Sequence, residues 1–289
     1  MVRMFMRKAQ YYMVDKNKTD DETRVLAVSV ANGLTQLGAF CGRRLVGTWE
    51  VSTPRHLTMD EARAHALEFW TRVFGATEEA PRPNGAILAC VVPSHSDAWT
   101  RALTAVSETR ALVVGPGLKT GIGMRLDSPG DVGSDRVANV VAARNDYGFP
   151  VVVVSLGTTT NIEVVDERGT FVGGAIAPGV MLGARALSEA AARLPLVELS
   201  VPRSVVGRNT REAIQAGVVL GEAARVDGLV DAVFEGLGSE APLVVTGHHA
   251  SVVNPLLRHQ TVLDPTLTLR GLARIWRTNR RDVCKAGKR

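Results

Sequence analysis

The chain has 289 residues, of which 45% are hydrophobic and 22% are charged, and its formal net charge is +5. This apolar content is enough for one large domain or two ordinary ones, and it argues against a disordered chain. No apolar run approaches the roughly 20 residues of a membrane span, and the charged first residues do not fit a secretory signal. We therefore expect a globular, cytoplasmic protein that does not associate with membranes.

The excess positive charge lies near the two ends of the chain. Residues 270–289 contain eight Lys and Arg against the single acid Asp282, and residues 1–24 contain six basic and four acidic residues. The rest of the chain is net acidic and no aromatic residues alternate with the basic ones, so nucleic-acid binding is not expected. The three cysteines show no paired spacing, which argues against a disulfide framework or a zinc site.

The elements of the first part of the chain follow a leader, residues 1–24, that shows no sustained periodicity. Residues 25–51 predict a strand, a turn of small residues, a second strand and, after the turn CGRR, a third strand. Residues 59–74 have the apolar spacing of a helix, with acids in the first turn, and residues 86–94 predict a buried strand.

The later part of the chain continues the alternation of helices and strands. Residues 131–148 predict a helix that ends at Gly148 and leads into the strand, turn and strand of residues 151–174. Further helices are expected at about 185–193, from 210 toward 229, and at 267–280, with a strand at PLVVTG (242–247). Such alternation predicts an α/β fold.

A hairpin unit is repeated in the two halves of the sequence. With a shift of 126 residues, Ser29 falls on Ser155 and Gly33 falls on Thr159. The repeat predicts two similar halves. We therefore divide the chain into a loose leader (1–24), an N-terminal half (25–121), a C-terminal half (122–280) and a basic tail (281–289).

Five blocks of sequence resemble the type III pantothenate kinases. They are GPGLKTG (115–121), DSPGDVGSDRVANVVAA (127–143), GGAIAPG (173–179), RLPLVEL (193–199) and DPTLTLRGLARI (264–275). The resemblance implies two ribonuclease-H-like halves of the actin-like ATPase superfamily, with mixed sheets flanked by helices, and a dimer. It also implies transfer of the ATP γ-phosphate to the hydroxyl of pantothenate, the first step toward coenzyme A.

The acceptor side of the site matches this resemblance. Phosphoryl transfer requires a base near the attacking hydroxyl and groups that position both substrates. The resemblance assigns the base to Asp135 and an anchor for the acceptor substrate to Arg136. It assigns the other substrate contacts to the glycine loop, namely Gly115, Gly117, Lys119 and Thr120. On the residues alone, Asp135 and Arg136 could equally be an ordinary acid and base on a helix surface.

The phosphate-binding hairpins depart from the family's pattern. Relatives begin each hairpin with an aspartate that serves the metal and the phosphates, whereas this chain has Ser29 and Ser155. The nucleotide-contacting positions that remain are Asn32, Gly157, Thr158, Thr159 and Gly247. A serine hydroxyl brings no negative charge, and Mg²⁺ is held through charged oxygens and ordered water. We therefore expect this chain alone to bind ATP and Mg²⁺ weakly.

Two further positions concern cations and the purine. Glu163 stands where the resemblance places the aspartate of a monovalent-cation site, which makes it a candidate ligand of K⁺ or NH₄⁺. His248 replaces a second glycine and is expected to crowd the purine. A metal site formed by His248 and His249 is the weaker alternative, because side chains of adjacent residues are expected to point apart.

Two functional hypotheses follow. The chain is a pantothenate kinase homologue that works as a degenerate subunit, in a homodimer or in a heterodimer with an intact type III pantothenate kinase subunit. The alternative is a non-catalytic pseudokinase that binds or regulates a partner. Retention of Asp135 and Arg136 beside the loss of both hairpin acids favours the first hypothesis, while activity of the chain alone is left open.

Overall fold

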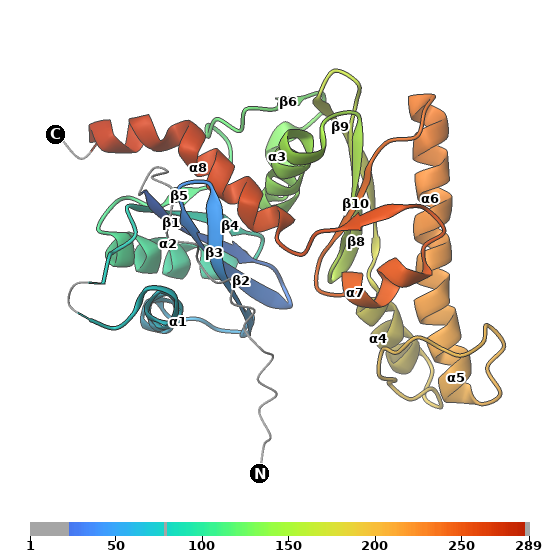
Figure 1. The fold of residues 1–289 in the computed structure, drawn as a ribbon. Coiled ribbons are helices and arrows are strands. Elements are labelled where there is room, and N and C mark those ends of the chain that lie inside the picture. The colour runs from blue at the N-terminus through green and yellow to red at the C-terminus, as the bar shows by residue number, and fades with distance from the viewer. Residues whose placement is uncertain (1–22, 78–79, 287–289) are drawn as a thin grey trace, which may run out of the picture. The chain divides into compact units, whose positions relative to one another are not determined.

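A computed structural model describes residues 23–77 and 80–286, with side chains up to residue 280. The expected leader lies outside the described residues up to residue 22, and the last three residues of the expected tail lie outside them as well. The described residues form two compact units (Figure 1). The first unit contains the chain up to Thr120, Gly133–Ala138 and the segment from Leu269, and the second contains Gly121–Val132 and Asn139–Thr268.

The first unit is built on a five-stranded mixed sheet with the order β3-β2-β1-β4-β5. The first three strands form an antiparallel meander, and β4 and β5 extend the sheet in parallel with β1. The strands are β1 (Arg24–Val30), β2 (Leu34–Cys41), β3 (Arg44–Ser52), β4 (Gly85–Cys90) and β5 (Leu112–Val113).

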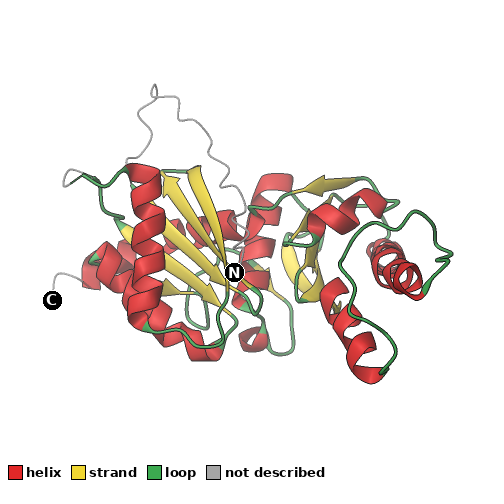
Figure 2. Cartoon of the chain, turned by 90° about the horizontal axis from the view of Figure 1, so that it is seen from below, coloured by secondary structure: helices red, strands yellow, loops and turns green. Residues whose placement is uncertain are grey.

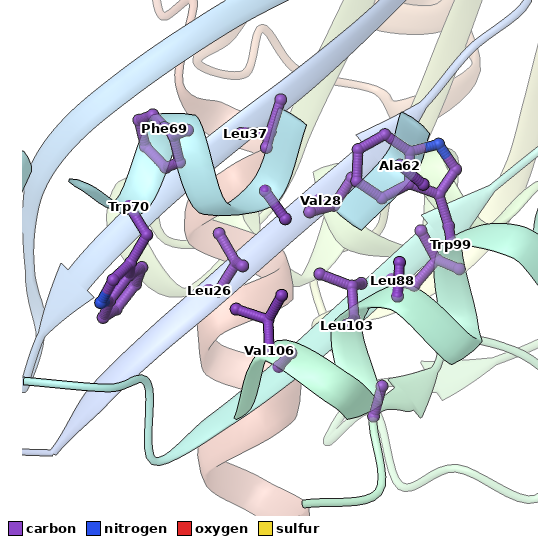
Figure 3. Packing of buried hydrophobic residues seen from close by; sticks show 14 of the residues in the cluster. Leu26, Val28, Leu37, Ala62, Phe69, Trp70, Leu88, Trp99, Leu103 and Val106 are labelled. Atoms are coloured by element: carbon purple, nitrogen blue, oxygen red, sulfur yellow. The ribbon is translucent and has the colours of Figure 1, made fainter. Parts of the chain in front are cut away.

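Helices cover this sheet with large apolar side chains. On one face, α1 (Met59–Phe74) and α2 (Pro93–Ser107) bury a core that includes Phe69, Trp99 and Leu103 (Figure 3). A further helix, α8 (Leu267–Ala286), also packs on this sheet. Its Leu269 lies against Gly38, and its Trp276 lies against Gly85, where a β-carbon would collide with the indole ring. Burial of such large side chains is a main source of stability in a domain of this size.

The second unit has a six-stranded mixed sheet with the order β11-β10-β7-β8-β9-β6. The meander β7-β8-β9 and the parallel pairing of β10 with β7 reproduce the arrangement of β1-β2-β3 and β4. The repeat predicted from the sequence is therefore confirmed as a repeat of topology. The strands are β6 (Gly123–Met124), β7 (Val151–Leu156), β8 (Thr159–Val165), β9 (Thr170–Pro178), β10 (Leu243–Thr246) and β11 (Thr261–Leu263).

Alternate valines of β7 contribute to two cores, one on each face of this sheet. Figure 2 shows the helices of the chain in red and its strands in yellow. Val151 and Val153 pack with α3, whereas Val152 and Val154 pack with α4, α6 and α7. The helices are α3 (Ser134–Tyr147), α4 (Val180–Ala190), α5 (Thr210–Gln215), α6 (Gly221–Leu237) and α7 (Ala250–Val253). Shorter helical turns are η1 (Pro129–Asp131), the π-helical η2 (Ala216–Leu220) and η3 (Asn254–Leu256).

The helices of residues 23–77 and 80–286 were compared with the requirements of a membrane span. None of these helices combines the length and the apolar character that crossing a bilayer requires.

Candidate functional site

The hairpin between β1 and β2 carries the first of the two serines. Ser29 is 6% exposed and lies opposite Gln36 in the sheet. The backbone N–H of Ala31 donates to the carbonyl of Leu34 over 3.0 Å, which leaves Asn32 exposed in the turn. The hydroxyl of Thr53 donates to the Ala31 carbonyl over 2.7 Å and braces the turn. The turn of this hairpin therefore presents neutral polar groups in place of a carboxylate.

Asp135 lies in the first turn of α3. The backbone N–H of Arg136 donates to its Oδ1 over 2.8 Å. A β-carbon at Gly133 would lie only 2.7 Å from the same oxygen, so the glycine leaves room for the carboxylate. Burial raises the pKa of Asp135, against the opposing effects of this hydrogen bond and of the Arg136 charge. A carboxylate with a raised pKa is better suited to accept a proton near neutral pH.

Residues 115–120 of the glycine loop GPGLKTG lie in the same compact unit as Asp135, and its last residue, Gly121, begins the second unit. The N–H of Leu118 donates to the carbonyl of Gly115 over 3.2 Å, and Gly117 has a φ of +89°. Pro116 before a glycine with positive φ is the sequence of a type II turn. The turn therefore depends on Gly117 for its conformation, and it leads directly into Lys119 and Thr120.

The second serine hairpin, between β7 and β8, is closed by neighbouring glycines. The N–H of Gly157 donates to the Thr159 carbonyl over 3.0 Å, and the N–H of Gly179 donates to the Thr158 carbonyl over 3.1 Å. A β-carbon at Gly179 would lie 2.4 Å from the Gly157 oxygen. Gly179 was missed as a structural support of the hairpin, although the block GGAIAPG contained it.

The segment after β10 packs against this hairpin. Gly247 has a φ of +95°, and a β-carbon there would lie 2.4 Å from the Leu156 oxygen, which accepts the N–H of His249 over 3.0 Å. Two atoms of the His248 ring lie 4.0 Å from the β-carbon position of Gly157. The imidazole of His248 therefore lies beside the turn between β7 and β8, and crowding of the purine by this ring stays a prediction.

The expectation that the two adjacent histidines point apart is wrong. The ring centroids of His248 and His249 are 3.8 Å apart, because the tight turn at Gly247 brings both rings to one side. Within the part of the chain that the structure describes, no group of three or more His, Cys, Asp or Glu side chains could hold a metal ion. The pair therefore lacks the further ligands that a zinc-like site needs.

A buried polar cluster on β8 and α6 was not found from the sequence. The hydroxyl of Thr160 donates to Glu222, and Arg225 donates to the same carboxylate and, over 2.5 Å, to the carbonyl of Pro178. These contacts connect the start of β8 and the end of β9 to α6. No short motif carries such a cluster, since its members are 62 residues apart in sequence.

The remaining predicted residues occupy defined places. Ser155 lies in β7 opposite Asn161 of β8 and beside Thr246 of β10. Glu163 lies in β8 with its side chain completely buried. The first unit contains Ser29 and Asn32. It also contains the residues predicted for the acceptor side, namely Asp135, Arg136, Gly115, Gly117, Lys119 and Thr120. The second unit contains Ser155, Gly157, Thr158, Thr159, Glu163 and Gly247.

The repeated sheets and their hairpins define the actin-like fold of two ribonuclease-H-like halves. MreB 5 of Spiroplasma citri, solved with AMPPNP, is similar with a TM-score of 0.51 and 11% identity over 92% of this chain and 99% of that one. A Campylobacter jejuni protein described as a Baf family transcriptional activator is similar with a TM-score of 0.54 and 16% identity, over 89% and 98% of the two chains. At these identities the likeness concerns the fold alone.

Sequence comparison identifies the family. The model of the type III pantothenate kinase family matches residues 25–232. Type III pantothenate kinases of Acidothermus cellulolyticus and Brevibacillus brevis are 40% and 38% identical, each over 88% of this chain and over 98% and 99% of the relatives. The enzyme of Listeria monocytogenes is 34% identical over 89% of this chain and 98% of its own. The chain therefore belongs to the type III pantothenate kinase family.

Proposed function

We propose that this chain takes part in the ATP-dependent phosphorylation of pantothenate, as a subunit whose nucleotide side is incomplete and which works with an intact type III pantothenate kinase subunit. The observation that supports the proposal is that the predicted acceptor side keeps its charged residues, whereas the predicted nucleotide side lacks its acidic residues. The acceptor side keeps Asp135 in a half-buried, hydrogen-bonded position beside Arg136. The nucleotide side has Ser29 and Ser155 in place of both hairpin acids.

The acceptor side suits the attack of an alcohol on a phosphoryl group. Asp135 accepts the proton of the pantothenate hydroxyl as its oxygen forms a bond to the γ-phosphorus and the bond to the bridging oxygen of ATP breaks. The positive charges of Arg136 and Lys119 suit the carboxylate of pantothenate. A correctly placed base contributes roughly 10²- to 10⁴-fold to the rate of such a reaction.

The hairpins do not fit a tightly held magnesium ion. Ser29, Asn32 and Ser155 supply neutral oxygens, whereas Mg²⁺ is usually bound through carboxylates and substrate phosphates. Two unit charges about 4 Å apart interact by roughly 4 kcal/mol at an effective dielectric constant of about 20. That energy corresponds to nearly a thousandfold in affinity for each lost acid, as an order of magnitude. No step of the reaction is therefore assigned to a metal held by this chain, and Glu163 remains the candidate ligand of a monovalent cation.

A surface suited to a second subunit supports the assembly. Exposed apolar side chains gather in residues 176–206 of the second unit: Ile176, Leu182, Leu187, Leu196, Val201, Val205 and Val206. Val205 and Val206 are each 73% exposed. Large apolar side chains exposed in number along one stretch of a chain favour a surface that another chain covers. We assign it to the partner subunit, homologous or identical.

A non-catalytic pseudokinase is the second candidate function. It is favoured by one observation, that neither serine hairpin has a carboxylate at the position where relatives carry an aspartate. Such a protein would bind its partner through the same apolar surface but would not contribute Asp135 to a shared reaction.

Co-expression with an intact subunit distinguishes the two candidate functions. The chain is co-expressed with an intact family member from the same genome, co-purified, and assayed for pantothenate phosphorylation with a coupled kinase assay. We expect the mixture to exceed this chain alone, and Asp135→Asn in this chain to lower the activity of the mixture. Separate elution of the two chains, with activity of the mixture unchanged by Asp135→Asn, would favour a stand-alone protein or a regulator.

A further inference from the structure

Asn279 of α8 holds the backbone of the glycine loop from across the first unit. Its Oδ1 accepts the backbone N–H of Lys119 over 3.2 Å, and its Nδ2 donates to the carbonyl of Lys119 over 2.8 Å. The two residues are 160 positions apart in sequence. A carboxamide that pairs with both backbone groups of one residue fixes that peptide segment in the manner of a neighbouring strand.

The buried amide has no spare donor. Asn279 is 4% exposed, and its Nδ2 also donates to the Ile275 carbonyl of its own helix over 2.8 Å. Both N–H groups and the oxygen are thus used. Because an unsatisfied buried polar group costs about 1 to 3 kcal/mol, the amide and the Lys119 backbone stabilise each other in this arrangement.

The loop is therefore fixed at two consecutive places. The turn Gly115–Leu118 is closed by its own hydrogen bond and by the positive φ of Gly117, and Asn279 holds the next residue. Lys119, whose side chain is exposed, and Thr120 follow the turn directly. A cation and a hydroxyl on a fixed backbone form a suitable contact for an anionic acceptor substrate, since little conformational freedom is lost on binding.

We propose that Asn279 is a positioning residue for the acceptor substrate: it fixes the Lys119 backbone so that Lys119 and Thr120 bind the carboxylate of pantothenate. The proposal rests on the proposed function. It assigns to α8, far along the chain from Asp135, a part in binding the acceptor but no part in proton transfer.

The test compares Asn279→Asp with Thr278→Ala in the full-length chain. The Asp variant keeps the shape of the side chain but places oxygen against the Lys119 carbonyl. Thr278 is the matched control, because it is exposed and its hydroxyl donates to Arg274 of the same helix. Two quantities are measured, namely hydrogen exchange of the peptide containing residues 115–121, and KM and kcat for pantothenate in the mixed assembly.

We expect Asn279→Asp to speed exchange at Lys119 and to raise KM for pantothenate about tenfold or more, with kcat within about twofold and KM for ATP unchanged. Thr278→Ala should change none of these. Gly117→Ala disturbs the same loop without touching α8, because nothing lies within 4 Å of its β-carbon position, and should also raise KM.

Two results would overturn the proposal. The first is unchanged exchange at Lys119 in Asn279→Asp, which would mean that the amide does not hold the loop. The second is faster exchange with an unchanged KM, which would mean that the loop does not position the substrate. If the unaltered mixture does not phosphorylate pantothenate at all, the proposed function fails instead, and the exchange measurement alone decides whether Asn279 fixes the loop.

Discussion

At the scale of single residues, the half-buried carboxylate of Asp135 is expected to reduce the stability of the folded chain. Its pKa in the folded chain is raised above its value in the unfolded chain, so the folded state binds its proton more readily. Stability therefore falls as pH rises between these two pKa values, and the cost is fully present above the pKa of the folded chain. At sufficiently low pH both states are protonated and the cost disappears.

Replacing Asp135 by Asn tests this sign. The neutral amide can still accept the N–H of Arg136 but carries no charge, so Asp135→Asn should raise the melting temperature at pH 7. The difference from the unaltered chain should shrink as the pH falls toward about 4 and below, the ordinary range of an aspartate pKa. Calorimetric melting of both proteins from pH 3 to pH 8 measures it, and a variant less stable than the parent at pH 7 would contradict the expected cost of burial.

The two serines give the second prediction at this scale. Ser29→Asp together with Ser155→Asp should improve the binding of ATP and Mg²⁺ by at least about tenfold, and by more than either change alone, because each adds a carboxylate for the metal. Ser29→Asn with Ser155→Asn is the control, since it matches the size of aspartate without its charge. Titration calorimetry with ATP and Mg²⁺ measures the affinities. Equal affinities of the Asp and Asn double variants would show that the acids are not the missing feature.

The sequence identified residues that lie in short motifs and missed those that act across the fold. Asp135, Arg136 and the turn of Gly117 could be predicted as site residues because neighbouring residues accompany them in recognisable blocks, and their roles stay predictions. Asn279 could not, because its partner is the backbone of Lys119, which any residue type supplies. The prediction that the side chains of His248 and His249 point apart also failed, since the orientation of the two rings depends on the backbone at Gly247.

At the scale of elements, the two glycines Gly247 and Gly228 should respond oppositely to the same change. A β-carbon at Gly247 would lie 2.4 Å from backbone, and its φ of +95° disfavours alanine as well. At Gly228, inside α6, nothing lies within 4 Å. We expect Gly247→Ala to destabilise the chain by about 1 to 3 kcal/mol or more, and Gly228→Ala to stabilise it by up to about 1 kcal/mol. Urea unfolding measures both, and equal effects would refute the close packing of the hairpin against the turn after β10.

Elements with local signals were predicted best. The helix expected at residues 59–74 is confirmed with these bounds, because Thr58 and Glu61 form a capping box and Gly75 ends it. The strand expected over residues 86–94 ends at Cys90, since Pro93 begins α2, which was not predicted. The last helix begins at Leu267 as expected and continues to Ala286, beyond the expected end at Arg280, because residues 281–286 contain neither glycine nor proline.

At the scale of the whole molecule, the internal repeat was enough to predict two related halves. Both sheets have an antiparallel meander joined by a parallel strand, as the shift of Ser29 onto Ser155 indicated. The composition of the first unit could not be read from the repeat, because it includes Gly133–Ala138 and the segment from Leu269. These segments meet by close backbone packing, in which a β-carbon at Gly271 would lie 1.9 Å from the Ala138 oxygen.

The proposed association of subunits is tested at the exposed apolar side chains of residues 176–206. Burying two valines that are 73% exposed in the free chain would remove apolar area from water on assembly, whereas two carboxylates there would have to be desolvated. We therefore expect Val205→Glu with Val206→Glu to weaken association with the intact subunit at least tenfold and to abolish the gain in pantothenate phosphorylation of the mixture. Sedimentation velocity and the coupled assay measure the two effects.

Leu67→Glu provides the control, because Leu67 is similarly apolar and 41% exposed but lies on α1 of the first unit. It should leave both association and activity unchanged. Thermal melting of each variant confirms that the folded state persists, since glutamate suits an exposed helix position and an exposed loop alike. If the double variant associates as tightly as the parent, the partner uses another surface, and the apolar side chains of residues 176–206 need a different explanation.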